Sequence, residues 1–134
     1  MKPCNVILVD DDADDMVFLK EAMEESGKFN IIASCNAEAS LIDVLQHTEQ
    51  VPDGIVCDLN MPVKNGIEVH NDLRDLDGYA DIPFVLVSGL EPSPAFEVKA
   101  AEEGLTTVMV KPTSMNGYRD FCVQLYSYLD EQRA

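Results

Sequence analysis

Short apolar runs rich in β-branched residues recur along the chain, and they constrain its fold more than any other feature. They alternate with longer segments whose apolar residues recur at helical spacing. Strands that are apolar at consecutive positions are buried on both faces, which is typical of a parallel sheet covered by helices on either side. The predicted strands are 6–9, 31–33, 55–57, 84–87 and 108–110. The sequence therefore predicts an α/β fold.

The intervening segments predict five helices, at 13–25, 37–47, 67–74, 94–103 and 117–132. Some of them carry clear start and stop signals. Asp12 is a good N-cap, Pro94 suits a first helical turn, and Gly27 follows a helix as a natural stop. With 134 residues and no linker or repeat, one compact domain is expected.

The charge of the chain argues against several kinds of partner. Nine Lys and Arg residues against 25 Asp and Glu residues give a formal net charge of −16. Such a field repels phosphate backbones and anionic lipid, so we expect no direct nucleic-acid partner and no membrane. No apolar stretch has the length of a signal-peptide core or a membrane span, which predicts a cytoplasmic protein. The four cysteines are widely spaced without a Cys-x-x-Cys pair, which favours buried free thiols over a zinc or redox site.

Polar side chains follow four of the five apolar runs directly. In an open parallel sheet, ligands bind beyond the carboxyl ends of the strands, so these side chains are expected to converge. They are Asp10, Asp11 and Asp12 after the first run, Asp58 after the third, Ser88 after the fourth and Lys111 after the fifth.

This set of residue types favours a metal and phosphoryl chemistry. Carboxylates without His or Cys partners suit a hard cation such as Mg²⁺, and a carboxylate beside such a metal can attack phosphorus to give an aspartyl phosphate. Lys111 would supply positive charge, and Ser88 could donate a hydrogen bond to the same oxygen. Taken singly, Asp12 could be only a helix cap, Ser88 a turn residue and Lys111 a solvated lysine. Their joint placement at one sheet edge favours a site.

On these residues the chain resembles the receiver domains of two-component response regulators. The motifs are the acidic pair after the first strand, "CDLNMPVKNG" at 57–66, "VLVSG" at 85–89 and "VKP" at 110–112. The resemblance spans essentially the whole chain. It implies a flavodoxin-like (CheY-like), doubly wound five-stranded parallel sheet of order 2-1-3-4-5 with five helices. It also implies that residues 1–134 are a single stand-alone receiver domain without an output domain.

The resemblance implies a role for each acidic residue of the site. Asp58 would be the phosphoacceptor. Asp11 and Asp58 would ligate Mg²⁺ through their carboxylates, Asn60 through its backbone carbonyl, and Asp10 mostly through water.

It also implies roles for residues around the phosphoacceptor. Lys111 would pair with the Asp58 carboxylate and later with the phosphoryl group, and Ser88 would follow the phosphoryl oxygen and pull its loop inward. Pro112 would follow a cis peptide bond that aims Lys111 into the site, and Gly66, with Met61 and Pro62, would shape the loop beyond Asp58.

The chain departs from the family pattern at three positions. Val108 stands where most relatives have a Tyr or Phe whose ring reports phosphorylation, so output is expected to use loop and backbone movement around 88–95 or another surface. Gly89 replaces the more usual Ala and is expected to loosen its loop. Leu90 places an apolar side chain near the site, where it would alter the lifetime of the phosphoryl group.

The resemblance implies a signalling function. A sensor histidine kinase or histidine phosphotransfer protein would phosphorylate Asp58, and the domain would then bind a downstream protein differently. Enzymatic activity would be limited to Mg²⁺-dependent self-phosphorylation and autodephosphorylation. Three aromatic residues of the last helix are candidates for a partner or homodimer contact: Phe121, Tyr126 and Tyr128. Of these, Phe121 is expected to lie in the core.

Two alternatives belong to other classes. One is a receiver-like protein-binding module that works without phosphorylation. The other is a phosphatase with an aspartate nucleophile, against which stands Asn60, because such enzymes usually carry a second acid at that position.

Overall fold

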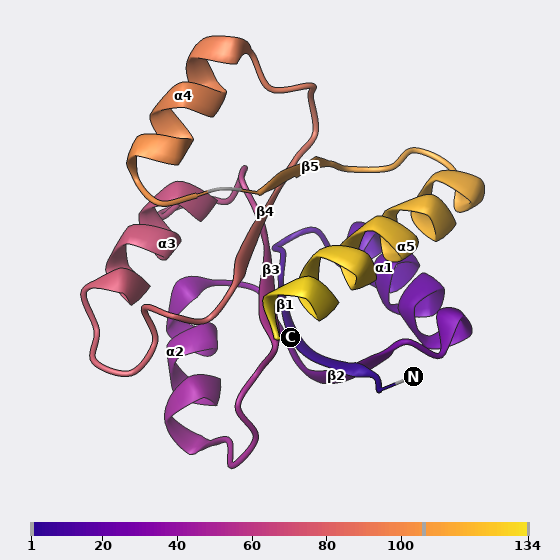
Figure 1. Ribbon diagram of the computed structural model, residues 1–134, viewed down its shortest axis with the longest axis horizontal. Helices are drawn as coiled ribbons and strands as arrows, with labels where there is room; N and C mark the ends of the chain where they lie inside the picture. Colours follow the sequence, from indigo (N-terminus) through magenta and orange to yellow (C-terminus); the bar gives the residue numbers. More distant parts are fainter. Residues whose placement is uncertain (1, 106, 134) are drawn as a thin grey trace.

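The computed structural model describes residues 2–105 and 107–133, and a five-stranded parallel sheet lies at its centre (Figure 1). The strand order is β2-β1-β3-β4-β5, and each neighbouring pair is parallel. The predicted fold class and strand order are therefore confirmed. The strands are β1 (Cys4–Val9), β2 (Phe29–Cys35), β3 (Gly54–Asp58), β4 (Phe84–Ser88) and β5 (Val108–Val110).

Helices cover both faces of the sheet, as the apolar strands predicted. Helices α1 and α5 lie side by side on one face, and α2, α3 and α4 lie on the other (Figure 1). The winding reverses between β1 and β3, so a crevice opens beyond the carboxyl ends of these two strands. The helices are α1 (Ala13–Ser26), α2 (Glu38–His47), α3 (Gly66–Arg74), α4 (Pro94–Glu102) and α5 (Met115–Gln132).

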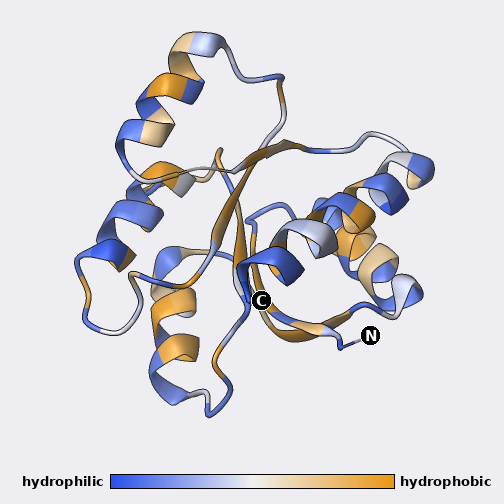
Figure 2. Cartoon of the chain, in the orientation of Figure 1, coloured by the Kyte–Doolittle hydropathy of each residue, from blue (hydrophilic) through white to orange (hydrophobic). Residues whose placement is uncertain are grey.

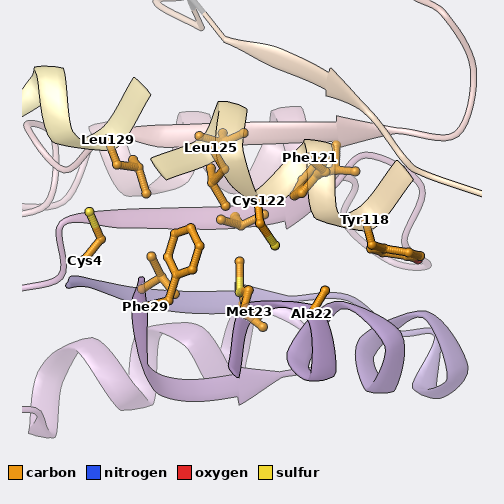
Figure 3. Packing of buried hydrophobic residues seen from close by; sticks show 14 of the residues in the cluster. Cys4, Ala22, Met23, Phe29, Tyr118, Phe121, Cys122, Leu125 and Leu129 are labelled. Atoms are coloured by element: carbon orange, nitrogen blue, oxygen red, sulfur yellow. The ribbon is translucent and has the colours of Figure 1, made fainter. Parts of the chain in front are cut away.

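Alternate residues of the central strands point to opposite layers of the core. Val6 and Leu8 of β1 pack with α1 and α5, whereas Ile7 and Val9 pack with α2, α3 and α4. Figure 2 shows the apolar strands enclosed by helices whose outer sides are polar. In the first layer, α1 and α5 meet each other and the sheet through large buried side chains (Figure 3). Among them are Met23 of α1, Phe29 of β2, and Phe121, Leu125 and Leu129 of α5. Phe121 is thus a core residue, as expected.

The predicted element boundaries differ from the structure mainly at the sheet edge. Strand β2 runs over Phe29–Cys35, well beyond the predicted 31–33, because polar Asn30 and Ser34 are exposed on this edge strand and interrupt its apolar pattern. The β1–β2 pairing also shifts register between Val6 and Ile7. Helix α5 begins two residues before the predicted start, since Ser114 Oγ accepts the N–H of Gly117 at 3.0 Å and caps it.

The predicted helix signals hold. Asp12 caps α1, accepting the N–H groups of Asp14 and Asp15 at 3.0 and 3.1 Å. Gly27 ends α1 in the left-handed conformation with φ 69°. All four cysteines are buried and free, as predicted. Among the described residues, no helix combines the length and apolar character that crossing a membrane requires.

Candidate functional site

Four of the polar residues predicted to converge line one pocket at the carboxyl edge of the sheet: Asp11, Asp12, Asp58 and Lys111. Asp10 lies 3.1 Å from Lys111 Nζ, and the Ser88 hydroxyl bonds within its own loop. The strand ends bring these side chains together because parallel strands present their carboxyl ends on the same side. The pocket is lined by Asp11, Asp12, Asp15, Asp58, Asn60, Gly89 and Lys111.

Three carboxylates form the core of the site. One ligand oxygen from each of Asp10, Asp11 and Asp58 lies within 4.8 Å of the other two. Asp10 and Asp11 follow β1, and Asp58 ends β3, so the neighbouring central strands place them together. An all-oxygen donor set of this size fits a hard divalent cation, and Asn60 stands in the same pocket wall.

Asp58 is the most buried acid of the three. Its side chain is only 7% exposed. Burial and then the negative charge of Asp10 raise the pKa of Asp58 to about 6, against the opposing effects of Lys111 and of the Asn60 backbone N–H. A bound cation would favour the ionised form, so the site is built to hold positive charge beside Asp58.

Lys111 is surrounded by carboxylates. Its Nζ lies 2.8 Å from Asp15, 3.1 Å from Asp10 and 3.6 Å from Asp58. Burial lowers the pKa of Lys111, but the hydrogen bonds to Asp15 and Asp10 outweigh burial, and the pKa is raised overall. Lys111 therefore supplies the positive charge that makes the acidic cluster tolerable.

Asp15 is a site residue that the sequence reasoning missed. The sequence placed it only in the first turn of α1, near the positive end of the helix dipole. No local pattern singles Asp15 out, because its contact with Lys111 joins positions 96 apart in the chain. Asp15 thus reaches Lys111 from α1, at a distance shorter than that to Asp58.

Ser88 is buried at the end of β4, but its hydroxyl is turned into its own loop. Ser88 Oγ donates to the Leu90 carbonyl at 2.8 Å and accepts the Leu90 N–H at 3.3 Å. The Leu90 side chain is 81% exposed, so it does not cover the pocket. Gly89 lines the pocket without a positive φ, and a Cβ there would meet nothing within 4 Å. An alanine would therefore fit this position.

The predicted cis bond before Pro112 was wrong, because every peptide bond among residues 2–105 and 107–133 is trans. Lys111 is aimed by the sheet instead. Its backbone N–H donates to the Ser88 carbonyl at 2.7 Å, which continues the β4–β5 pairing to the lip of the pocket.

Gly66 closes the loop beyond Asp58, as predicted. Its N–H donates to the Leu59 carbonyl at 3.0 Å. A Cβ at Gly66 would lie 2.7 Å from the Asp58 carbonyl oxygen and would also collide with the Leu86 side chain. Only glycine permits this close approach.

Val108 is half-buried and packs against the layer that contains α3 and α4. It pairs with Leu86 of β4. Because the residue is a valine, the site has no aromatic ring at this position. All three residues of the edge strand β5 pair with β4, so a valine at position 108 is compatible with the fold.

Comparison with known proteins agrees with this geometry. The family model described as the response regulator receiver domain matches residues 6–120. The transcriptional regulatory protein PrrA of Mycobacterium tuberculosis is 35% identical over 80% of this chain, which spans only 43% of that protein's length. The chemotaxis protein CheY of Halobacterium salinarum is 32% identical, over 86% of this chain and 93% of its own.

Solved structures have the same fold. The phosphorylated cyanobacterial phytochrome response regulator RcpA superposes with a TM-score of 0.79 at 18% identity, covering 95% of this chain and 94% of its own. The chemotaxis response regulator CheY4 of Vibrio cholerae superposes with a TM-score of 0.74 at 21% identity, over 93% and 99% of the two chains. From the family model and the CheY relative, this chain belongs to the receiver domains of two-component response regulators.

Proposed function

We propose that this receiver domain is a phosphorylation switch whose phosphoacceptor is Asp58. A sensor histidine kinase or phosphotransfer protein would present a phosphohistidine. An Asp58 carboxylate oxygen would bond to phosphorus as the bond from phosphorus to the imidazole nitrogen breaks. One observation carries the proposal: the buried Asp58 carboxylate lies 3.6 Å from Lys111 Nζ, in a cluster with Asp10 and Asp11.

The acidic cluster would hold Mg²⁺. The Asp11 and Asp58 carboxylates and the Asn60 backbone carbonyl would be direct ligands, and Asp10 would act mostly through water. When bound, Mg²⁺ would neutralise negative charge that accumulates as the phosphoryl group is transferred. The separation of no more than 4.8 Å among the three carboxylates supports this assignment.

Lys111 and Ser88 would bind the phosphoryl group once it is on Asp58. Lys111 would pair with a phosphoryl oxygen, and Ser88 would exchange the Leu90 carbonyl for another phosphoryl oxygen. That exchange would move the loop after β4 and change the surface offered to a downstream protein in the cytoplasm. In this proposal residues 1–134 act as one receiver unit.

The test is phosphorylation by a small donor. The wild-type protein and Asp58→Asn are incubated with acetyl phosphate and Mg²⁺, and their intact masses are compared, with EDTA as the metal control. A single phosphoryl adduct on the wild type alone, lost with EDTA, is expected. Absence of an adduct would instead favour a module that works without phosphorylation. Sustained hydrolysis of varied phosphate esters would favour a phosphatase.

A further inference from the structure

The loop between β3 and α3, residues 59–65, adopts a strained conformation at its tip. Val63 has a φ of 67°, and the Lys64 N–H donates to the Pro62 carbonyl at 2.7 Å, which makes a γ-turn centred on Val63. The Val63 side chain is fully exposed, so no packing compensates for this backbone. A β-branched residue in the left-handed region is sterically strained. Other contacts must therefore hold the loop.

The two ends of this loop are fixed by backbone and capping bonds. At its base the Gly66 N–H donates to the Leu59 carbonyl at 3.0 Å. At the start of α3, Asn65 and Glu68 form a capping box with two bonds of 3.0 Å. These bonds lie at the ends of the loop and do not reach Val63. The segment around Val63 therefore depends on side-chain contacts.

Lys64 ties this segment to two helices. Its Nζ forms an ion pair with Asp72 of α3 and lies 3.7 Å from Oε1 of Glu38, the first residue of α2. The Glu38 side chain is 18% exposed, and its Oε2 is buried without a hydrogen-bond partner. Burial and then the neighbouring Asp72 carboxylate raise the pKa of Glu38, whereas Lys64 opposes both. Lys64 thus stabilises two close acids and anchors the loop tip at once.

The same loop carries the residue whose carbonyl is assigned to the metal. Asn60 lies four positions before Lys64, and its backbone N–H stabilises the Asp58 carboxylate. If the tip left its left-handed conformation, the peptide groups before it would shift, and the Asn60 carbonyl with them.

We propose that Lys64 is a positioning residue for the metal site, which it serves by holding the loop onto Glu38 and Asp72. The inference rests on the proposed Mg²⁺ binding. Lys64 would thus favour Mg²⁺ binding although it is itself a cation and touches none of the proposed ligands.

The sign of the effect separates positioning from simple electrostatics. Mg²⁺ affinity is measured by isothermal titration calorimetry for the wild type, Lys64→Met and Lys99→Met. Lys99→Met removes the same positive charge as Lys64→Met. Lys99 is exposed on α4 and makes no ion pair among the described residues, so its replacement disturbs no contact of this kind. Loss of a positive charge by itself tightens cation binding. We expect Lys64→Met to weaken Mg²⁺ binding instead, by roughly tenfold at most, the lower end of the range for loss of a group that bonds a metal ligand directly.

Further measurements exclude a folding defect. Metal-free thermal melts of each variant check the fold, and Lys64→Arg, which keeps the charge, should bind Mg²⁺ nearly as the wild type does. Acetyl phosphate should modify Lys64→Met slowly at low Mg²⁺ and at the wild-type rate at saturating Mg²⁺. Equal Mg²⁺ affinity in Lys64→Met and Lys99→Met would overturn the inference alone. A wild type that binds no Mg²⁺ would overturn the proposed metal site and the inference with it.

Discussion

At the scale of single residues, the acidic cluster is organised by one lysine. Lys111 lies within 3.6 Å of three carboxylates that belong to β1, β3 and α1 or their ends. Such close acids repel one another strongly at short range, and a shared ammonium offsets this repulsion. In the unmodified site Asp15 is the nearest partner of Lys111, and Asp58 is the most distant of the three.

Replacement of Asp15 should release this lysine. In Asp15→Asn the ammonium loses its nearest carboxylate and can approach the Asp58 or phosphoryl oxygens. We expect acetyl phosphate to modify Asp58 about threefold faster, the factor that corresponds to about 0.7 kcal/mol for a partly exposed pair. The measurement is the initial rate of adduct formation by mass spectrometry. Asp14→Asn removes the same charge from the same helical turn, and an equal acceleration there would show that contact with Lys111 is irrelevant.

Val63 offers a second test at this scale. Glycine adopts a positive φ without a steric penalty, so Val63→Gly should stabilise the protein by about 1 kcal/mol in spite of the greater freedom of the unfolded chain. Urea denaturation at 25 °C measures the change. Val63→Ala keeps a Cβ and should bring little gain. If the alanine variant is stabilised as much as the glycine variant, the backbone is not strained at Val63.

At the scale of elements, the end of α5 is fastened to the start of β1. Arg133, at the end of α5, donates from Nη1 to the Pro3 carbonyl at 2.8 Å and also bonds the Lys2 carbonyl. It lies 3.4 Å from Asp53, whose carboxylate accepts the Asn5 N–H at 2.7 Å. Tyr126, a candidate partner contact in the sequence, packs edge-on against Phe29 and donates its hydroxyl to the Lys2 carbonyl at 2.9 Å. The chain ends thus stabilise the layer formed by α1 and α5.

Loss of this fastening should be costly. Arg133→Met removes hydrogen bonds from a side chain that is 17% exposed, and we expect the free energy of unfolding to fall by about 2 kcal/mol. Arg119→Met is the matched control. Arg119 forms one 3.7 Å ion pair with Glu25 and donates to Asn116 Oδ1 at 3.1 Å, but it is 57% exposed, so its loss should cost less than about 0.5 kcal/mol. Equal losses in the two variants would contradict the role assigned to Arg133.

At the scale of the whole molecule, the buried Asp58 carboxylate lowers the free energy of unfolding of the metal-free protein. Asp58 has a usual pKa of 3.8 and a folded-state pKa of about 6. Between these values the unfolded chain loses its Asp58 proton before the folded protein does, so folding becomes less favourable as the pH rises through this window. Above it, the buried negative charge destabilises the metal-free protein.

Asp58→Asn should therefore be more stable than the wild type at neutral pH without divalent cations. We expect a gain of about 2–3 kcal/mol above pH 6 that fades as the pH falls towards 4, since the wild-type carboxyl is then protonated as well. Urea denaturation across this pH range measures it. Asp77→Asn, at an exposed position between α3 and β4, controls for the loss of one negative charge. A pH-independent difference between Asp58→Asn and the wild type would contradict the raised pKa.

Local sequence patterns were sufficient to predict the class of the fold and most of the residues of the site. Continuous apolar strands can be buried only between two layers of helices, and parallel strands must present their carboxyl ends together, so Asp10, Asp11, Asp58 and Lys111 could be grouped without coordinates. Helix caps such as Asp12 were also readable, because a cap depends on residues only a few positions away.

The pairing of the charged and polar groups within the site could not be predicted before the chain was folded. Asp15 as the nearest acid to Lys111, the turn of Ser88 towards Leu90, and the bond of Lys64 to Asp72 depend on side-chain directions at sites brought together from distant segments. The length of β2 likewise follows from its pairing with β1 across the sheet. Local patterns carry the periodicity that selects a fold, but the competition among charges within a few ångströms is settled only when the chain has packed.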